Sequence, residues 1–389
     1  MTFQEENDKL LFDILDQTFF VYWKENNLLT DMNNDKPRGL QINVTYACNQ
    51  KCEYCYLIKY GDQLYPKELD QQDLILANLK ILLSWFSENY PNLDLLDIFT
   101  GEIWQAQFGL DLLQTILDYK GNIKLKTIMI PSNMSFLLDS EQTKKIQNYI
   151  DLFQKQNIRI MFSSSVDGLY IEDYTRPLNN KSMVRDQAFY DRLFEFNKKN
   201  KYAVHPMLSA YAIEHWKENY LWWYKQCSKY DIPFLTHVML LEVRNDDWTD
   251  AKIESYLEFL NFQFDFVYNE IFHKDRKLMM RYVFGIGQGD TAYQGLLWGR
   301  NDDRMTCSIS NHLAVRLGDL SICPCHRTSY PQFLYGNFVV EDGKIIGLHA
   351  NNPQLATHLL CTNMKNGIFG CDDCIYTDIC LRQCLGSCY

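Results

Sequence analysis

Between residues 40 and 242, short apolar segments alternate with amphipathic helical segments, and this alternation constrains the fold more than any other feature. Strands separated by helices form parallel β/α units with right-handed crossovers. Six such units predict an α/β fold, a partial (β/α)6 TIM-like barrel that is open on one side. The expected strands are Leu40–Val44, Leu95–Phe99, Thr127–Ile130, Ile158–Ser163, Ala203–Leu208 and His237–Glu242, and the expected helices are Gln71–Glu88, Leu110–Tyr119, Ser140–Lys155, Gln187–Lys199 and Ile213–Tyr230.

The cysteines are distributed unevenly, and this distribution predicts how the chain divides into domains. Of the 13 cysteines, three lie at residues 48–55, one is Cys227, and nine fall between Cys307 and Cys388. An amphipathic run from Leu10 to Phe20 predicts a helix that caps the fold. The predicted segments are an N-terminal helical extension over 1–37, the partial barrel over 38–242, a bridging region over 243–306 and a cysteine-rich domain over 307–389.

Composition excludes several classes of function. The net charge of −11 argues against a nucleic-acid groove, since affinity for phosphates depends on basic side chains. The sequence has no apolar run near about 18 residues and no signal peptide, so it predicts a cytoplasmic protein without a membrane span. In that compartment, cysteines favour metal binding or catalysis over disulfide formation.

Cys48, Cys52 and Cys55 form a C-x3-C-x2-C motif directly after the first expected strand. A loop that leaves a strand end is where α/β proteins place chemistry, and three thiolates together favour a soft metal centre. A structural zinc site normally takes four ligands, and no further His or Cys follows at short spacing. A [4Fe–4S] cluster held by three thiolates leaves one iron open to another molecule. The alternative is three unrelated buried cysteines.

The motif resembles the signature of the radical S-adenosylmethionine (SAM) enzymes, in which an aromatic residue precedes the last cysteine. Here that residue is Tyr54, which is thereby expected to line the cofactor site. The resemblance implies that the open iron binds the amino and carboxylate groups of SAM. It also implies reductive cleavage of SAM to methionine and a 5′-deoxyadenosyl radical, which abstracts hydrogen from an unactivated carbon. The partial barrel is also the fold that this family implies.

Two segments after the expected strands resemble SAM-binding motifs of that family. Gly101 and Glu102 follow the second strand, where the family has a Gly-Gly-Glu type motif that binds the SAM amino group. Asn133 ends the third strand in a sequence that resembles Thr-Asn-Gly, with Met134 in place of the glycine. The resemblance therefore implies that Gly101, Glu102 and Asn133 contact the cofactor.

The fourth expected strand is followed by Ser165-Val-Asp-Gly, which resembles the family's Ser-x-Asp-Gly sequence, whose serine contacts SAM. Arg176 then matches an Asp-x-x-Arg spacing found in peptide-modifying members. Ser165 and Arg176 are therefore expected to contact SAM. Ser165 could also simply end a strand, and Arg185 and Arg192 are alternatives to Arg176.

The cysteines after residue 300 resemble the pattern of a SPASM domain, which is appended to radical SAM enzymes and holds two auxiliary iron–sulfur clusters. A zinc ribbon built on the C-x2-C pair is the alternative. The proximal cluster lacks an obvious fourth ligand, which Cys325 or Cys361 could supply unless that iron stays open. The resemblance implies a distal cluster held by Cys371, Cys374, Cys380 and Cys388 and a proximal cluster held by Cys307, Cys323 and Cys384.

Together these features predict an enzyme whose cofactors are SAM and three [4Fe–4S] clusters, one SAM-binding and two auxiliary. Because SPASM enzymes mostly modify peptides, the expected function is maturation of a ribosomally synthesised peptide (RiPP). A thioether crosslink is favoured over a carbon–carbon crosslink, since an open iron could bind a substrate thiolate. The alternatives are an anaerobic sulfatase maturase that forms formylglycine and a non-catalytic iron–sulfur electron carrier.

The expected partners are a precursor peptide and an external electron donor of flavodoxin or ferredoxin type. Because only about 37 residues precede the barrel, leader recognition is expected to use the barrel, the C-terminal domain or a separate leader-binding protein. Neither nucleic acid nor a membrane is expected as a partner. The sequence does not identify a catalytic general base.

Overall fold

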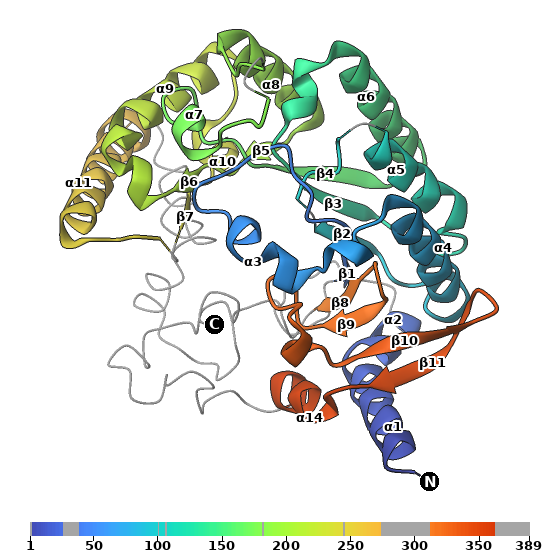
Figure 1. Ribbon diagram of the computed structural model, residues 1–389. Helices are drawn as coiled ribbons and strands as arrows, with labels where there is room; N and C mark the ends of the chain where they lie inside the picture. The colour runs from blue at the N-terminus through green and yellow to red at the C-terminus, as the bar shows by residue number, and fades with distance from the viewer. Residues whose placement is uncertain are drawn as a thin grey trace.

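A computed structural model of the protein describes residues 2–25, 39–99, 101–105, 107–180, 183–243, 246–273 and 312–361, except the side chains of residues 236, 242 and 361. Its main sheet has nine strands in the order β11-β10-β9-β8-β1-β2-β3-β4-β5. The strands from β8 to β5 in this order run parallel, so the predicted α/β fold with a parallel sheet is confirmed. Helices α4, α5, α6, α8 and α9 follow one another along the outer side of these strands (Figure 1).

The parallel strands lie where the sequence predicted them, with small shifts at their ends. They are β1 (Gly39–Asn43), β2 (Leu95–Phe99), β3 (Thr127–Ser132), β4 (Arg159–Ser164) and β5 (Ala203–Val204). The fifth expected strand is divided into β5 and β6 (Met207–Leu208), because Pro206 between them has no N–H to continue a ladder. The last expected strand is shortened to β7 (Leu241–Glu242), which pairs with β6, since Phe234–His237 forms α10.

The helices between the strands also agree with the prediction. They are α4 (Gln72–Asn89), α5 (Phe108–Tyr119), α6 (Ser140–Lys155), α8 (Gln187–Asn200) and α9 (Trp216–Lys229). Asp139 begins α6 by accepting hydrogen bonds from two backbone N–H groups, and Asp186 caps α8 in the same way with one. None of the helices in the described ranges has the length and hydrophobicity that crossing a membrane requires.

Burial alternates along β3 and β4 and separates the two faces of the sheet there. On β4, Ile160 and Phe162 are buried, whereas Met161 and Ser163 are half-buried. The Phe162 ring lies 6.0 Å from that of Phe196 on α8, so the buried set faces the helices. Because successive side chains of a strand point to opposite faces, the half-buried set lines the inner face of the barrel.

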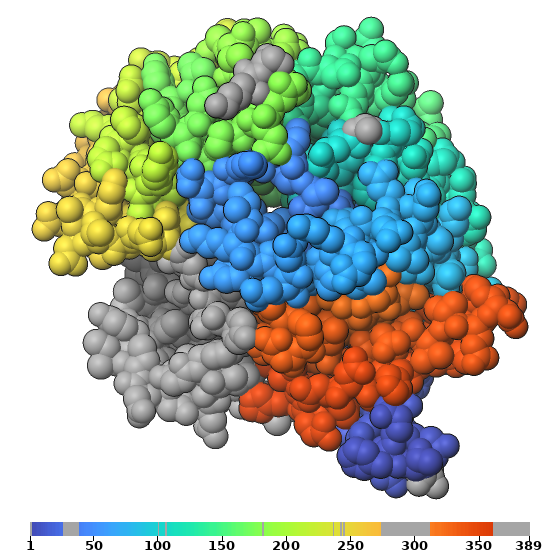
Figure 2. All heavy atoms as spheres, viewed as in Figure 1, coloured from blue at the N-terminus to red at the C-terminus, as the bar shows by residue number. Residues whose placement is uncertain are grey.

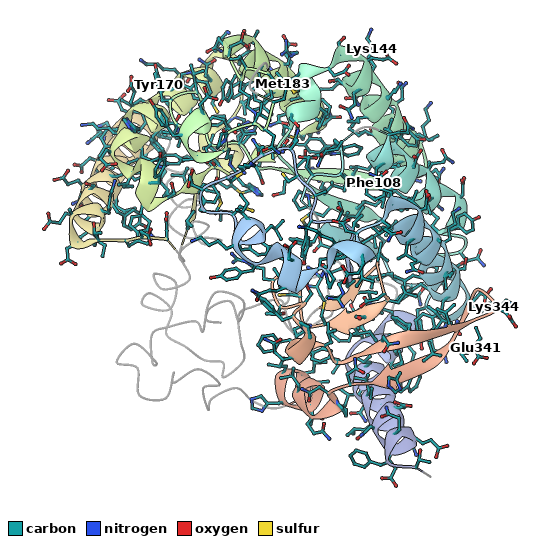
Figure 3. The ribbon with its side chains drawn as sticks, in the orientation of Figure 1. Phe108, Lys144, Tyr170, Met183, Glu341 and Lys344 are labelled. Carbon is teal, nitrogen blue, oxygen red and sulfur yellow. The ribbon has the colours of Figure 1, made fainter. Side chains whose placement is uncertain are left out.

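The described part of the cysteine-rich region continues the same sheet. β8 (His312–Arg316) pairs with β1 in parallel, with Gly39 opposite His312, and β9 (Ser321–Cys323), β10 (Gly336–Glu341) and β11 (Lys344–Ala350) follow antiparallel. Glu341 and Lys344 lie at the exposed tip of the β10–β11 hairpin (Figure 3). The predicted domain limits remain predictions, because residues 274–311 and 362–389 lie outside the described residues.

The N-terminal helices cover this hairpin. α1 (Phe3–Leu15), η1 (Asp16–Phe20) and α2 (Val21–Glu25) follow one another, so the helix expected around Leu10 to Phe20 is present. Asp8 accepts a hydrogen bond of 2.7 Å from the Ala350 N–H of β11. The remaining described helical segments are α3 (Tyr56–Leu64), η2 (Lys67–Leu69), η3 (Ser135–Leu138), α7 (Glu172–Thr175), η4 (Ala210–His215), α11 (Asp250–Phe266), η5 (Val267–Phe272), η7 (Pro331–Phe333), α14 (Pro353–Ala356) and η8 (Thr357–Cys361).

Candidate functional site

The C-x3-C-x2-C motif lies on the loop between β1 and α3 (Tyr56–Leu64), at the carboxyl end of the parallel strands. Cys52 is buried, and Cys48 and Cys55 are half-buried. The Cys55 N–H donates to the Cys52 carbonyl at 3.0 Å, and Cys55 is the N-cap residue of α3. Figure 2 shows the blue segment that contains this loop between the green helices and the orange β8–β11 segment.

Gly101 and Glu102, which follow β2, pack directly on the backbone of this loop. The Gly101 N–H donates to the Thr45 carbonyl at 2.7 Å, and the Glu102 N–H donates to the Ala47 carbonyl at 2.9 Å. A Cβ atom on Gly101 would lie 2.3 Å from the Ala47 carbonyl oxygen. Glycine is therefore required here for the close approach of two backbones.

The Glu102 carboxylate is buried at the ends of β2 and β3, with 1% of the residue exposed. It accepts hydrogen bonds from the Asn133 N–H (2.7 Å), the Trp104 N–H (3.2 Å) and the Ser132 hydroxyl (3.2 Å). Burial raises the pKa of Glu102 to about 7, and these three hydrogen bonds oppose the shift. A cation placed beside this carboxylate would favour its ionised form, as an ammonium ligand requires.

Asn133 connects Glu102 with the cysteine loop. Its Nδ2 atom lies 3.9 Å from the Cys48 sulfur and donates to the Asn49 side-chain oxygen at 2.7 Å. Met134 after it is buried and has a φ of +60°, a left-handed conformation that glycine adopts freely. The backbone at the position that corresponds to the family's glycine thus has a conformation that favours glycine, although the residue in this chain is methionine.

Asp167 brings together Tyr54 and Arg176, two residues that the sequence predicted separately. The Tyr54 hydroxyl donates to Asp167 at 2.6 Å, and Arg176 Nε lies 2.9 Å from the same carboxylate. The Arg176 guanidinium also lies over the Tyr54 ring, 5.2 Å from its centroid. Further donors to Asp167 are the Thr175 hydroxyl and the Met207 N–H, so this buried carboxylate is fully surrounded by donors.

Ser165 directly follows β4 and is half-buried, and its N–H donates to the Ser132 carbonyl at 2.7 Å. Two residues earlier, the Ser163 hydroxyl pairs with His205 Nδ1 at 2.6 Å. Burial lowers the pKa of His205 to about 4, so its imidazole is neutral near pH 7. Of the arginines considered for this site, Arg176 contacts Tyr54, whereas Arg192 is exposed on α8.

Two residues that organise the site were not predicted as site residues. Asp167 belongs to the same Ser-x-Asp-Gly sequence as Ser165, and its position beyond a strand end is the signal that could have found it. Ser132, which donates to Glu102, carries no comparable signal, because a serine at a strand end is common.

Cys323 ends β9 and lies beside the end of β1. Asn43 Nδ2 lies 3.8 Å from the Cys323 sulfur, and the Cys323 thiol donates to the Cys325 carbonyl at 3.6 Å. Burial raises the pKa of the Cys323 thiol, and the neighbouring Cys325 raises it further. The other cysteines predicted as auxiliary-cluster ligands are Cys307, Cys371, Cys374, Cys380, Cys384 and Cys388, which lie outside the described residues, as does the Cys361 side chain.

The loop from Cys323 to Ser329 contacts Phe99 of β2 and residues on either side of the Cys48–Cys55 motif. The Tyr46 hydroxyl donates to the His326 carbonyl at 2.7 Å, and the His326 ring is stacked on that of Phe99 at 3.8 Å. The Arg327 guanidinium lies over the Tyr56 ring at 4.8 Å from its centroid. A predicted ligand of the SAM cluster and a predicted ligand of an auxiliary cluster therefore lie on adjoining loops.

The chemistry of the donor set fits an iron–sulfur cluster. Burial and then the charge of Glu102 raise the pKa of Cys48 to about 12, and burial raises that of Cys52 to about 12 against the opposing effect of Arg176. Buried thiols of this kind ionise when a metal compensates their charge. In the described ranges no three His, Cys, Asp or Glu side chains converge as ligands of one metal ion. The thiolates of an iron–sulfur cluster each bind a different iron atom, so their sulfur atoms need not converge on one point. The assignment of Cys48, Cys52 and Cys55 as cluster ligands remains a prediction.

No protein-family model matches the chain, and no curated protein matches its sequence. Solved structures match its fold. Native anSMEcpe with bound AdoMet (SAM) superposes with a TM-score of 0.52 at 16% identity over 88% of each chain. The same protein with AdoMet and a Cp18Cys peptide gives 0.51 at 16% identity over 88% of each chain. SuiB of Streptococcus suis gives 0.44 at 12% identity over 75% of this chain and 61% of SuiB.

The chain has the fold of the anSMEcpe structures. The resemblance to radical SAM enzymes that the sequence predicted is thereby confirmed at the level of the fold. Because the sequences are only 16% identical, the fold match by itself does not establish the activity of this chain.

Proposed function

We propose that the protein is a radical SAM enzyme that modifies a peptide, with Cys48, Cys52 and Cys55 as ligands of the SAM-binding [4Fe–4S] cluster. The observation that carries this proposal is the position of a buried carboxylate, Glu102, beside the cysteine loop. Asn133 contacts both of them, through its N–H to Glu102 and its side chain toward Cys48. The fold shared with AdoMet-bound anSMEcpe supports the proposal.

The residues around this loop have complementary roles in the proposed site. When bound, the cluster and SAM supply an electron and a 5′-deoxyadenosyl radical that takes a hydrogen atom from the substrate. Glu102 accepts hydrogen bonds from the SAM ammonium group, whose charge keeps this carboxylate ionised. Arg176, whose Nε faces Asp167, offers its other N–H groups to the SAM carboxylate.

The remaining predicted contacts complete this assignment. Gly101 lets the turn at Glu102 approach the cysteine loop. The Tyr54 ring packs against the Arg176 guanidinium and so fixes its position. Ser165 directly follows β4 and is half-buried, and we assign it a contact with bound SAM. The described residues do not identify a general base.

The proposed substrate is a ribosomally synthesised peptide, and the favoured product is a thioether crosslink. Two features support this substrate class: the anSMEcpe structure holds a peptide, and Cys323 lies on a loop that adjoins the SAM loop. A proximal auxiliary cluster with an open iron would bind a substrate thiolate, whereas ligation by Cys325 or Cys361 would close that iron.

A second candidate is formation of formylglycine in a sulfatase. The specific observation that favours it is the fold match to anSMEcpe, an anaerobic sulfatase-maturating enzyme, with and without a cysteine-containing peptide. The two candidates differ in product mass, because a crosslink removes two hydrogen atoms from the peptide, whereas formylglycine formation replaces the thiol group and one hydrogen of the cysteine side-chain carbon by a carbonyl oxygen.

The proposal includes three [4Fe–4S] clusters, of which two are auxiliary, and an external flavodoxin or ferredoxin as electron donor. It also includes leader recognition by the barrel, by the cysteine-rich region or by a separate leader-binding protein. We further propose that the protein acts in the cytoplasm, where the thiols remain reduced.

The experiment that tests the function is anaerobic reduction of the iron-loaded enzyme with SAM, followed by measurement of 5′-deoxyadenosine and of peptide mass. We expect 5′-deoxyadenosine from the wild type and from a Cys227→Ala control, whose thiol is buried on α9 and is not a predicted cluster ligand. Absence of 5′-deoxyadenosine with intact clusters would overturn the proposal and would favour a non-catalytic iron–sulfur electron carrier.

A further inference from the structure

A buried ion pair between Glu172 and Arg185 adjoins two segments of the proposed SAM site, at Asp167 and at Asn133. The Arg185 side chain is 0% exposed and that of Glu172 is 2% exposed, and Arg185 Nη1 donates to Glu172 Oε1. The sequence offered Arg185 only as an alternative to Arg176. Its guanidinium contacts protein groups, however, so its role is to act through the residues that it holds.

Glu172 reaches the part of the site built around Asp167. Its Oε2 atom accepts hydrogen bonds from the Asp167 N–H (2.5 Å) and the Gly168 N–H (3.2 Å). Gly168 has a φ of +118°, and a Cβ atom there would lie 2.4 Å from the Asn219 side-chain oxygen. Only glycine therefore fits at this backbone turn, beside which the Asp167 side chain accepts a hydrogen bond from Tyr54.

Arg185 reaches the part of the site built around Asn133. Its Nη2 atom donates to the Asn133 carbonyl at 3.3 Å. The same residue donates its N–H to Glu102 and points its side chain toward Cys48. One buried ion pair thus contacts the backbone of both segments that carry predicted SAM contacts, one beyond β3 and one beyond β4.

We propose that the Glu172–Arg185 pair positions the Asn133 and Asp167 segments relative to each other, so that Glu102 and Arg176 bind the two charged groups of one SAM molecule. This inference rests on the proposed function. A buried ion pair is a poor source of stability, because apolar side chains of similar volume are often equally stable in its place. What apolar side chains cannot supply is the set of directional hydrogen bonds to two separate backbone segments.

The test is the affinity of the iron-loaded protein for SAM, read from the change that SAM causes in the EPR spectrum of the reduced cluster. The double variant Glu172→Gln/Arg185→Met removes both charges together and leaves neither unpaired. We expect the dissociation constant for SAM to rise by about 10- to 100-fold, as when groups that orient a ligand's first contacts are removed, with unchanged iron content.

A matched control is Glu141→Gln/Lys145→Met, which removes an exposed pair on α6 with an N–O distance of 2.8 Å. We expect this control to bind SAM like the wild type. An equal affinity of the Glu172/Arg185 double variant and the wild type would overturn the inference while leaving the proposed function intact. A wild type whose EPR spectrum does not respond to SAM would overturn the proposed function itself.

A second variant keeps the test decisive if the double variant fails to fold. Arg185→Lys retains the charge opposite Glu172 but replaces a planar fork by a single ammonium, which cannot serve two acceptors in fixed directions. Weaker SAM binding by this folded variant supports the inference, and unchanged binding overturns it.

Discussion

Two loops that carry thiols meet at the carboxyl end of β1, and they are held in different ways. The first thiol loop (residues 44–55) is tied to other segments by backbone hydrogen bonds, including those from the Gly101 and Glu102 N–H groups. The second thiol loop (residues 323–329) is held by side chains. Arg316 donates to the Ser329 carbonyl at 3.1 Å, and Tyr46 donates to the His326 carbonyl.

This difference has a physical consequence for how each loop responds to substitution. A backbone hydrogen bond does not depend on the side chain, so the course of the first thiol loop is preserved when its side chains change. The second thiol loop depends on the particular donors Arg316 and Tyr46, and the latter belongs to the first loop. The first thiol loop is therefore fixed by the backbone of the barrel, whereas the position of the second against the barrel depends on particular side chains.

The largest expected effect separates the two loops by chemistry. Cys48→Ala removes a proposed ligand of the SAM cluster and is expected to abolish 5′-deoxyadenosine formation. Cys323→Ala removes a proposed auxiliary ligand and is expected to spare part of the SAM cleavage while stopping product formation. Chromatography of 5′-deoxyadenosine and mass spectrometry of the peptide measure both. Full product from the Cys323 variant would contradict the assignment of the second loop.

The next effect concerns the carboxylate that adjoins the first thiol loop. Burial raises the pKa of Glu102 from 4.5 to about 7. Between these pH values the Glu102 carboxyl is protonated in the folded protein and ionised in the unfolded chain. Stability from this group is therefore complete below pH 4.5 and is lost as the pH rises through 7. Relative to the Glu102→Gln variant, the free energy of unfolding of the wild type is expected to fall by about 3 kcal/mol between these limits. Denaturant unfolding without SAM measures it. A constant difference between the two proteins would refute the raised pKa.

A smaller effect tests the close backbone contact of the first thiol loop. Gly101→Ala places a Cβ atom 2.3 Å from the Ala47 carbonyl oxygen and is expected to lower the free energy of unfolding by up to about 3 kcal/mol. Gly347→Ala on β11 is the control, because its Cβ atom would meet no heavy atom within 4 Å. Equal stabilities of the two variants would show that the turn moves away at little cost.

The smallest effect compares two tyrosines of the first thiol loop. Tyr54→Phe removes a hydrogen bond to the Asp167 carboxylate and is expected to lower the free energy of unfolding by about 2 kcal/mol. Tyr46→Phe removes hydrogen bonds to two uncharged partners, the His326 carbonyl and the Ser329 hydroxyl, and is expected to lower it by about 1 kcal/mol. Urea unfolding measures both. The reverse order would mean that the contact between the loops is the stronger one.

The sequence predicted the strands and helices of the barrel because their signals are local. Alternation along β3 and β4 and the helical spacing of α6 each depend on a few consecutive residues. The division at Pro206 was missed although proline is a local sign that a strand is interrupted. The last strand was predicted too long, since a short apolar run does not show that residues 234–237 form a helix. The cysteine motif was recognisable because its three thiols are close in the chain.

The amino-acid sequence by itself determined the order of β/α units, the position of the thiols after β1 and the set of residues expected to bind SAM. Only the tertiary structure decided which of these residues meet and what holds them. Asp167 joins Tyr54 to Arg176, and the β8 strand pairs with β1 across more than 260 residues of chain. Such contacts depend on the packing of distant segments, in which burial and charge pairing choose partners that no local pattern encodes.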